Sequence, residues 1–169
     1  MADAAPTLGR TQGRPEPEGD DYPTQIFDTN PGETFIVRNV AALVPPFETT
    51  PGQHGVSAAL EFAVQFLKVE EVVVMGHGSC GGCAAALSEQ MKDMPHGKGG
   101  FIADWITLLD DARTKVAHDH GDLDSKAAQL AMEHEGVRTS LTNLRTFPCI
   151  QEKEANGSIR QIGAWFAIA

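Results

Sequence analysis

The sequence lacks a long hydrophobic run. No apolar stretch approaches the roughly 20 residues that a membrane-spanning helix needs. Residues 1–21 contain no apolar segment of the kind found in secretory signals. We therefore expect neither a membrane span nor a secretory leader.

Cysteine is scarce, with three residues in a chain of 169. An odd number this small does not provide the disulfide framework of a secreted mini-domain. Free thiols persist most readily in a reducing compartment. These observations favour a cytoplasmic location.

Basic residues are in the minority. The chain has 13 Lys and Arg against 23 Asp and Glu, which gives a formal net charge of −10. A chain this acidic is a poor candidate for binding nucleic acid or an anionic membrane surface. Net charge does not exclude a local basic pocket for a small anion.

The chain has enough hydrophobic residues, 41% of its composition, for one domain with a real core. Residues 1–22 differ from the rest because they are polar and rich in Pro, Gly and Glu. We interpret them as a disordered tail. Residues 23–169 then form the domain.

Hydrophobic periodicity and turn residues divide the domain into alternating elements. We predict strands over residues 34–40, 69–75 and 159–168. We predict helices over residues 55–68, 84–92, 102–116, 125–136 and 139–147. Asp122 or Asp124 is a candidate cap for the helix that begins at Ser125. This order indicates an α/β fold.

A glycine-rich loop carries the most informative residues. The apolar, β-branched run 71–75 is typical of a strand buried on both faces, and it leads into the sequence Gly-His-Gly-Ser-Cys-Gly-Gly-Cys. His77 then lies at the carboxyl end of a strand, where ligands bind in open α/β sheets. Cys80 lies near the start of a helix, which favours the metal-binding thiolate. His77 and Cys80 together have the character of half a zinc site.

Two other interpretations of the loop remain open. Cys80 and Cys83 form a Cys-x-x-Cys pair after a strand, which is the placement of thiol-disulfide proteins. Alternatively, both cysteines are simply buried, as free cysteines often are. Ser79 fails the nucleophile-elbow pattern because a histidine stands two residues before it.

The remaining charged and imidazole side chains form no ligand set at recognisable spacing. We expect His118 and His120 to be solvated at a helix end. We also expect Glu133 and Glu135 to lie on a solvated helix surface.

Five segments resemble the β-class carbonic anhydrases, and together they extend over about residues 23–169. They are residues 26–41 (IFDTNPGETFIVRNVA), 56–64 (VSAALEFAV), 76–82 (GHGSCGG), 141–148 (LTNLRTFP) and 163–166 (GAWF). The resemblance implies a mostly parallel sheet flanked by helices. It also implies a homo-oligomer, either a dimer or a tetramer.

The resemblance further implies a zinc ion held by two cysteines and one histidine. His77 and Cys80 match two of these ligands, and the backbone of Gly81 and Gly82 would line the substrate pocket. The family uses the metal to lower the pKa of bound water, which then adds to carbon dioxide to give bicarbonate. No general acid or base is identified in the sequence.

The chain departs from the family at its first zinc motif, a strand that ends in Cys-x-Asp-Ser-Arg. No cysteine precedes Cys80. A gapless placement puts Glu16, Glu18 and Asp20 at the motif's cysteine, aspartate and arginine. Glu16, Glu18, Cys83 or a partner chain are the candidates for the missing ligands. The sheet is also expected to lack one central strand, which would expose an edge and apolar surface.

The leading prediction is therefore a β-class carbonic anhydrase homologue whose carbon dioxide hydration is reduced or lost. One alternative is an inactive assembly partner of an intact homologue, in a hetero-oligomer. Another is a Cys-x-x-Cys thiol-disulfide protein.

Overall fold

The computed structural model describes residues 23–167. These residues fall into two units, 23–34 and 35–167. The predicted tail over residues 1–22, with Glu16, Glu18 and Asp20, lies outside the described residues.

The first unit contains one short helix and one turn. Helix α1 spans Pro23–Ile26, and a turn follows in which the amide of Glu33 donates to the carbonyl of Asn30 at 3.1 Å. The Glu33 carboxylate accepts in return from the Asn30 backbone amide at 2.8 Å.

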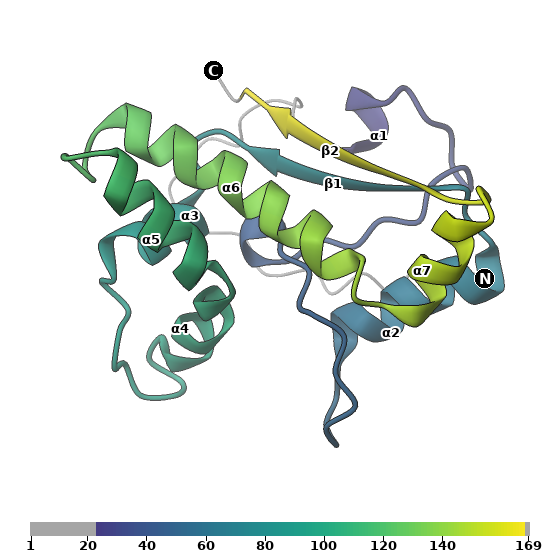
Figure 1. Ribbon diagram of the computed structural model, residues 1–169, viewed down its shortest axis with the longest axis horizontal. Helices are drawn as coiled ribbons and strands as arrows, with labels where there is room; N and C mark the ends of the chain where they lie inside the picture. Colours follow the sequence, from purple (N-terminus) through teal and green to yellow (C-terminus); the bar gives the residue numbers. More distant parts are fainter. Residues whose placement is uncertain (1–22, 168–169) are drawn as a thin grey trace. The chain divides into compact units, whose positions relative to one another are not determined.

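Two parallel strands form the sheet of the second unit. Strand β1 spans Glu71–His77 and β2 spans Arg160–Phe166, paired in continuous register (Figure 1). Both strands were predicted, β1 from its apolar, β-branched composition, and parallel pairing is what the α/β order requires. Among the described residues β1 pairs with β2 alone, so its other edge has no strand beside it.

The prediction of a strand over residues 34–40 is wrong. Residues 34–39 are irregular and lead into a 3₁₀ turn, η1, at Val40–Ala42. An extended segment becomes a strand only when its backbone pairs with a neighbour. Phe35, Ile36 and Val37 remain 41–47% exposed, and no described strand pairs with them. Their composition favours a strand, but the ladder partner is absent from the described sheet.

Helix α6, Lys126–Leu144, lies along one face of both strands (Figure 1). Two separate helices over 125–136 and 139–147 were predicted, and that division is wrong. Gly136, the end of the first predicted helix, lies inside α6 beside Leu109 and Cys83, at distances of 3.6 and 3.7 Å from an added Cβ. A glycine in a close helix contact does not end a helix when the surrounding turns are well packed.

Ser125 caps α6, in place of the predicted Asp122 or Asp124. Its hydroxyl accepts from the Ala128 amide at 3.2 Å and donates to the Asp122 carbonyl at 2.7 Å. This is the usual N-cap geometry, in which a side-chain oxygen satisfies one of the first free amides.

The other helices follow the predictions with shifted ends. Helix α2, Gly55–Glu61, continues as a π-helical turn, η2, at Phe62–Leu67, within the predicted 55–68. Helix α3 spans Gly81–Ser88. The predicted helix 102–116 is divided into α4 (Gly100–Ile106), η3 (Thr107–Leu109) and α5 (Asp110–Asp119).

Helix α7, Pro148–Ala155, was not predicted. The helix predicted over residues 139–147 was expected to end before Pro148. Pro148 begins α7, because proline lacks an amide hydrogen and fits the first helical turn, where no intrahelical acceptor exists.

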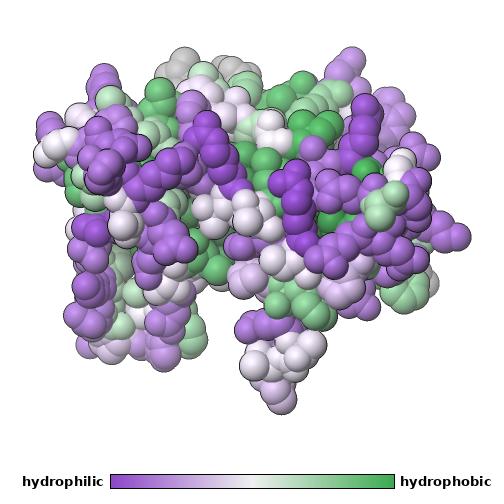
Figure 2. All heavy atoms as spheres, viewed as in Figure 1, coloured by the Kyte–Doolittle hydropathy of each residue, from purple (hydrophilic) through white to green (hydrophobic). Residues whose placement is uncertain are grey.

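The core has two clusters of buried side chains. One joins α3, α5 and α6 around Leu109, Val116 and Met132, and the other lies around Val64, Phe147 and Ile150. The opposite face of the sheet is more exposed, with Val73 and Ile162 at 38% and 39%. Hydrophobic atoms are visible among hydrophilic ones in the region of the strands in Figure 2. No helix within residues 23–167 is long and apolar enough to cross a membrane.

Candidate functional site

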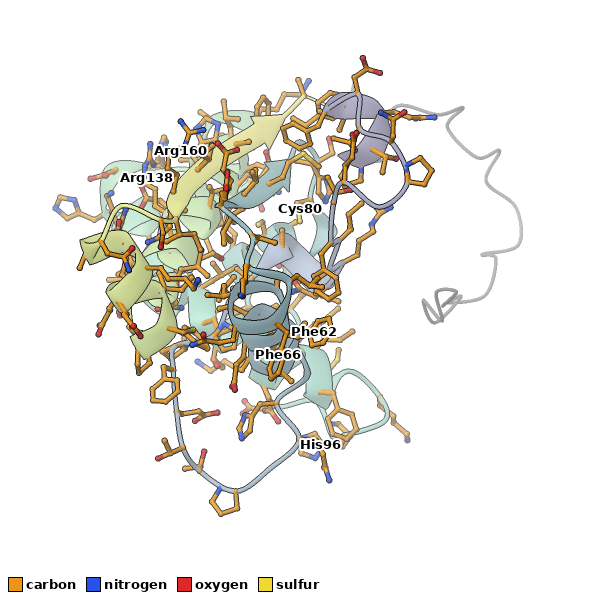
Figure 3. All side chains as sticks on the ribbon, turned by 90° about the vertical axis from the view of Figure 1, so that its right-hand side faces the viewer. Phe62, Phe66, Cys80, His96, Arg138 and Arg160 are labelled. Atoms are coloured by element: carbon orange, nitrogen blue, oxygen red, sulfur yellow. The ribbon has the colours of Figure 1, made fainter. Side chains whose placement is uncertain are left out.

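The glycine loop adopts the predicted strand-to-helix turn. β1 ends at His77, and the Gly78 amide donates to the Phe166 carbonyl at 2.8 Å, which extends the pairing with β2 by one bond. Ser79 then takes a left-handed conformation with φ of 56°. Cys80 is the N-cap of α3 (labelled in Figure 3). The tight turn therefore brings His77 and Cys80 to the same carboxyl edge of the sheet.

The ring of His77 is oriented by its own loop. Its Nδ1 lies 2.9 Å from the Gly78 carbonyl oxygen. A carbonyl only accepts, so in the neutral ring Nδ1 carries the hydrogen and Nε2 keeps its lone pair. A second hydrogen bond of this kind is how metal-binding histidines are held in one tautomer.

The ionised form of the Cys80 thiol is favoured by its surroundings. Cys80 is 4% exposed, and a hydrogen bond from Cys83 lowers the pKa of the Cys80 thiol to about 6, against the opposing effect of burial. The Cys83 and Gly82 amides act in the same direction. The pKa of Cys83 is raised, first by the hydrogen bond with Cys80 and then by burial. The pair therefore favours one thiolate, at Cys80.

Sequence reasoning missed the residues that hold Cys80. Glu133 of α6 is 3% exposed and not on a solvated surface as expected. Its Oε1 accepts from the Cys80 amide at 3.1 Å and from Gln129 Nε2 at 3.2 Å, and its Oε2 accepts from Trp165 Nε1 at 3.2 Å. The only signal in the sequence was the spacing of Gln129 and Glu133, four residues apart on one helix face.

The two glycines after Cys80 occupy different environments. A Cβ added at Gly81 would have nothing within 4 Å, and Gly81 is exposed. A Cβ added at Gly82 would lie 2.8 Å from the Ala41 side chain, so α3 packs closely on η1 there. Gly81 alone of the two faces open space.

The other histidines do not approach this loop through any described contact. His96 pairs with Asp104 at 2.7 Å and His118 with Asp119 at 2.8 Å, both at exposed positions. The solvated character expected for His118 is confirmed by its 86% exposed side chain.

The donor types fit zinc, but their number does not. Imidazole nitrogen and thiolate sulfur are common zinc ligands, and catalytic sites have three protein ligands. Within residues 23–167 no group of three His, Cys, Asp or Glu side chains is arranged to hold a metal. Glu16 and Glu18 lie outside the described residues. Residues 23–167 therefore provide a half-site.

A cavity of about 370 Å³ lies between α6 and β2, apart from the half-site. It is lined by His134, Val137, Arg138, Leu141, Gly163, Ala164 and Trp165. Neither His77 nor Cys80 lines it.

The fold and the loop define an α/β protein with a His-x-x-Cys half-site at the carboxyl edge of a parallel sheet. The carbonic anhydrase family model matches residues 22–169. A β carbonic anhydrase of Arabidopsis thaliana, "Beta carbonic anhydrase 3", is 34% identical over 144 residues, which is 85% of this chain. The chain belongs to the β-class carbonic anhydrase family.

Solved structures agree with this assignment. The β-carbonic anhydrase CcaA superposes with a TM-score of 0.77 at 25% identity, over 86% of this chain and 68% of that one. A tetrameric β-carbonic anhydrase from Sordaria macrospora gives 0.72 at 29%, over 86% and 69%. The Coccomyxa enzyme, in complex with acetazolamide, gives 0.73 at 28%, over 86% and 62%.

The shared region is only part of the relatives. The chain spans about half of the Arabidopsis protein, 55% of its length. The matched region therefore establishes the family of this chain, and its activity, metal and assembly are proposed below.

Proposed function

We propose that this chain acts in the reversible hydration of carbon dioxide to bicarbonate and binds zinc through His77 and Cys80. The observation that carries the proposal is the loop geometry: His77 held with Nε2 available and Cys80 favoured as a thiolate at one sheet edge. Gly81 and Gly82 are proposed to line the substrate side of the loop.

The half-site limits what the described residues do alone. Two ligands hold a metal less tightly than three and leave its position poorly fixed. We therefore propose that hydration is slow or absent unless a further ligand is provided. The candidates remain Cys83, Glu16 or Glu18, and a partner chain.

The test is metal content together with carbon dioxide hydration measured by stopped flow. The purified chain is expected to hold less than one zinc per chain and to hydrate carbon dioxide slowly. His77→Ala and Cys80→Ala should each lower the zinc content further. Unchanged zinc content in both variants would refute the ligand assignment. Stoichiometric zinc with rapid hydration by the parent would refute the expected loss of activity.

A second candidate function is assembly with another subunit, a second copy of this chain or an intact homologue. It is supported by exposed apolar side chains, among them Phe62 and Phe66 at 46% and 70%, and by the unpaired edge of β1 in the described sheet. Co-purification with a full-length homologue would favour a hetero-oligomer. A stable, active homodimer would count against it.

A third candidate is thiol-disulfide exchange by Cys80 and Cys83. It is supported by their hydrogen-bonded contact at the start of α3 and by the low pKa of Cys80. Both thiols are at least 95% buried, which limits access for a protein disulfide.

A further inference from the structure

Glu133 is a buried carboxylate without a part in the proposed zinc site. Placing a carboxylate in the interior is costly unless hydrogen bonds compensate. Its described partners all donate: the Cys80 amide, the Gln129 amide group and the Trp165 indole. An acceptor-only group with two oxygens suits three converging donors.

The carboxylate holds a backbone group that α3 cannot satisfy. Cys80 is the N-cap of α3, so its amide lies outside the helical hydrogen-bond ladder, and the residue is 4% exposed. Glu133 accepts from this amide, and Gln129 donates to the Cys80 carbonyl at 3.3 Å. Helix α6 thus holds the Cys80 backbone at both its donor and its acceptor.

The turn before Cys80 needs such a restraint. Ser79 has a φ of 56°, and the left-handed region is sterically unfavourable for an L-residue. Strained backbone persists only where surrounding contacts over-determine it. The bond from Cys80 to Glu133 lies one residue after the strained position.

The same carboxylate also forms a hydrogen bond with β2. Trp165 is in register with Gly76, one residue before His77, and its indole donates to Glu133 Oε2. His134 packs edge-on against the Trp165 ring, with ring centres 5.2 Å apart. One side chain on α6 therefore links the end of the sheet to the start of α3.

We propose that Glu133 is the positioning residue of the His77–Cys80 site, fixing the Cys80 backbone relative to β2 through its hydrogen bonds to Cys80 and Trp165. What the site binds rests on the proposed function, whereas the fixing of the loop does not. Glu133 acts through Cys80 and is not itself a metal ligand in this proposal.

Two substitutions test the proposal, with a matched control. Glu133→Gln keeps the shape but turns one acceptor into a donor that faces an N–H group. Glu133→Asp keeps the carboxylate on a shorter side chain. Glu135→Gln makes the same chemical change two residues along α6, at a side chain that pairs with Lys115 and Arg138 instead.

The first readout needs no metal. Hydrogen exchange of the Cys80 amide and of the Trp165 indole is measured by NMR in each folded variant. Glu133→Gln should speed exchange at both groups by about 10-fold or more, the loss of about 1.4 kcal/mol of protection. Glu133→Asp should recover part of the protection. Glu135→Gln should speed exchange at both groups by no more than about 5-fold, the effect of its small loss of global stability.

The second readout is affinity for Zn²⁺ alone, measured by competition with a chromophoric chelator. Glu133→Gln should weaken it by about 10–100-fold, as losses of supporting hydrogen bonds around metal ligands do. Glu135→Gln should change it less than about 3-fold. Unchanged exchange and unchanged affinity in Glu133→Gln would overturn the proposal.

The two proposals fail separately. If the parent binds no zinc but Glu133→Gln frees the Cys80 amide and the Trp165 indole, the proposed function fails and the positioning role stands. If zinc binds equally to both while exchange is unchanged, the proposed function stands and the positioning role fails. If Glu133→Gln does not fold, Glu133→Asp is compared with the control Glu135→Gln in both readouts. Faster exchange and weaker Zn²⁺ binding in Glu133→Asp than in the control would support the positioning role, and equal values would refute it.

Discussion

Gly76 of β1 and Val137 of α6 lie so close that a side chain on residue 76 has no room. A Cβ added at Gly76 would lie 2.7 Å from Val137 Cγ2. Real carbon atoms do not approach this closely without displacement. Gly76 therefore sets how near α6 comes to the sheet, and Glu133 lies one turn earlier on the same helix.

Gly76→Ala is expected to destabilise the protein by about 1–3 kcal/mol, because an added methyl in a packed interface forces a shift. Val137→Ala removes the obstructing methyl, so the double variant should be destabilised by less than the sum of the two single changes. Urea unfolding of the four proteins measures this coupling. Gly81→Ala is the control, since its Cβ meets nothing within 4 Å. If the two changes in unfolding free energy simply add in the double variant, the close contact between residue 76 and Val137 is refuted.

The sequence predicted the elements whose local pattern and tertiary contacts agree. Strand β1 and the loop that follows it combine an apolar run with glycine punctuation, so both propensity and packing favour the same structure. Residues 34–40 have a strand composition as well, but pairing depends on a neighbouring strand, which local sequence does not reveal. Gly136 and Pro148 misled because their effect depends on what packs beside them.

The same division applies to the candidate site. His77 and Cys80 are three residues apart, so the local turn alone places them together. Glu133 lies 53 residues after Cys80, and Trp165 lies 32 residues after Glu133. Only the packing of α6 on the sheet brings these three residues into contact, and no spacing rule encodes that contact.

The Glu135 carboxylate should contribute a pH-dependent part of stability. Burial acts against it, but hydrogen bonds and charges from Lys115 and Arg138 hold the pKa of Glu135 below its usual value of 4.5. A lowered folded-state pKa stabilises the protein above the unfolded pKa, and that stability is lost as pH falls through the folded pKa.

Glu135→Gln should therefore lower stability at pH 7 by about 0.5–1 kcal/mol, the range of partly exposed ion pairs. The difference from the parent should shrink as pH falls below 4.5. Denaturant unfolding at pH 7 and at about pH 3 measures both. A difference that stays constant with pH would show that Glu135 does not act through its charge.

Lys68 ends the helical segment in a left-handed conformation, with φ of 57° and ψ of 44°. Glycine adopts this conformation without the steric cost that other residues meet. Lys68→Gly is expected to raise the free energy of unfolding by about 0.5–1 kcal/mol. Lys68→Ala, which retains a Cβ, should not stabilise. Thermal or urea unfolding compares the two, and equal effects would rule out backbone strain at Lys68.

Phe35, Phe62 and Phe66 form an exposed aromatic row, in which Phe62 stacks on Phe66 at a ring distance of 5.7 Å and lies tilted against Phe35 at 5.8 Å. Figure 3 labels Phe62 and Phe66 on the same helical segment. If this row is an assembly surface, a charge there should disrupt association. Phe66→Glu is expected to reduce the oligomer fraction in sedimentation experiments.

Phe101→Glu is the matched control for the aromatic row. Phe101 is as exposed as Phe66, at 69% against 70%, but stacks on His96 outside the row. It should leave the oligomer fraction unchanged. Equal effects of Phe66→Glu and Phe101→Glu would point to general solubility and not to a specific surface.

Cys83 separates the zinc proposal from thiol-disulfide exchange. Exchange by a Cys-x-x-Cys pair needs the second thiol to resolve the mixed disulfide, so Cys83→Ala would abolish it. The zinc proposal assigns the metal contacts to His77 and Cys80, so Cys83→Ala should leave most of the zinc bound. We expect no catalysed exchange with a small disulfide substrate from the parent or the variant.

Cys149→Ala provides the control for that comparison, because Cys149 is also a free thiol but packs in the second core cluster. Zinc content should stay within about twofold of the parent in Cys149→Ala. Cys83→Ala removes a hydrogen bond to Cys80, so a partial loss of zinc, smaller than that in Cys80→Ala, is expected there. A parent that turns over disulfide while Cys83→Ala does not would establish the thiol-disulfide function. A complete loss of zinc in Cys83→Ala, with zinc retained in Cys149→Ala, would instead identify Cys83 as a zinc ligand.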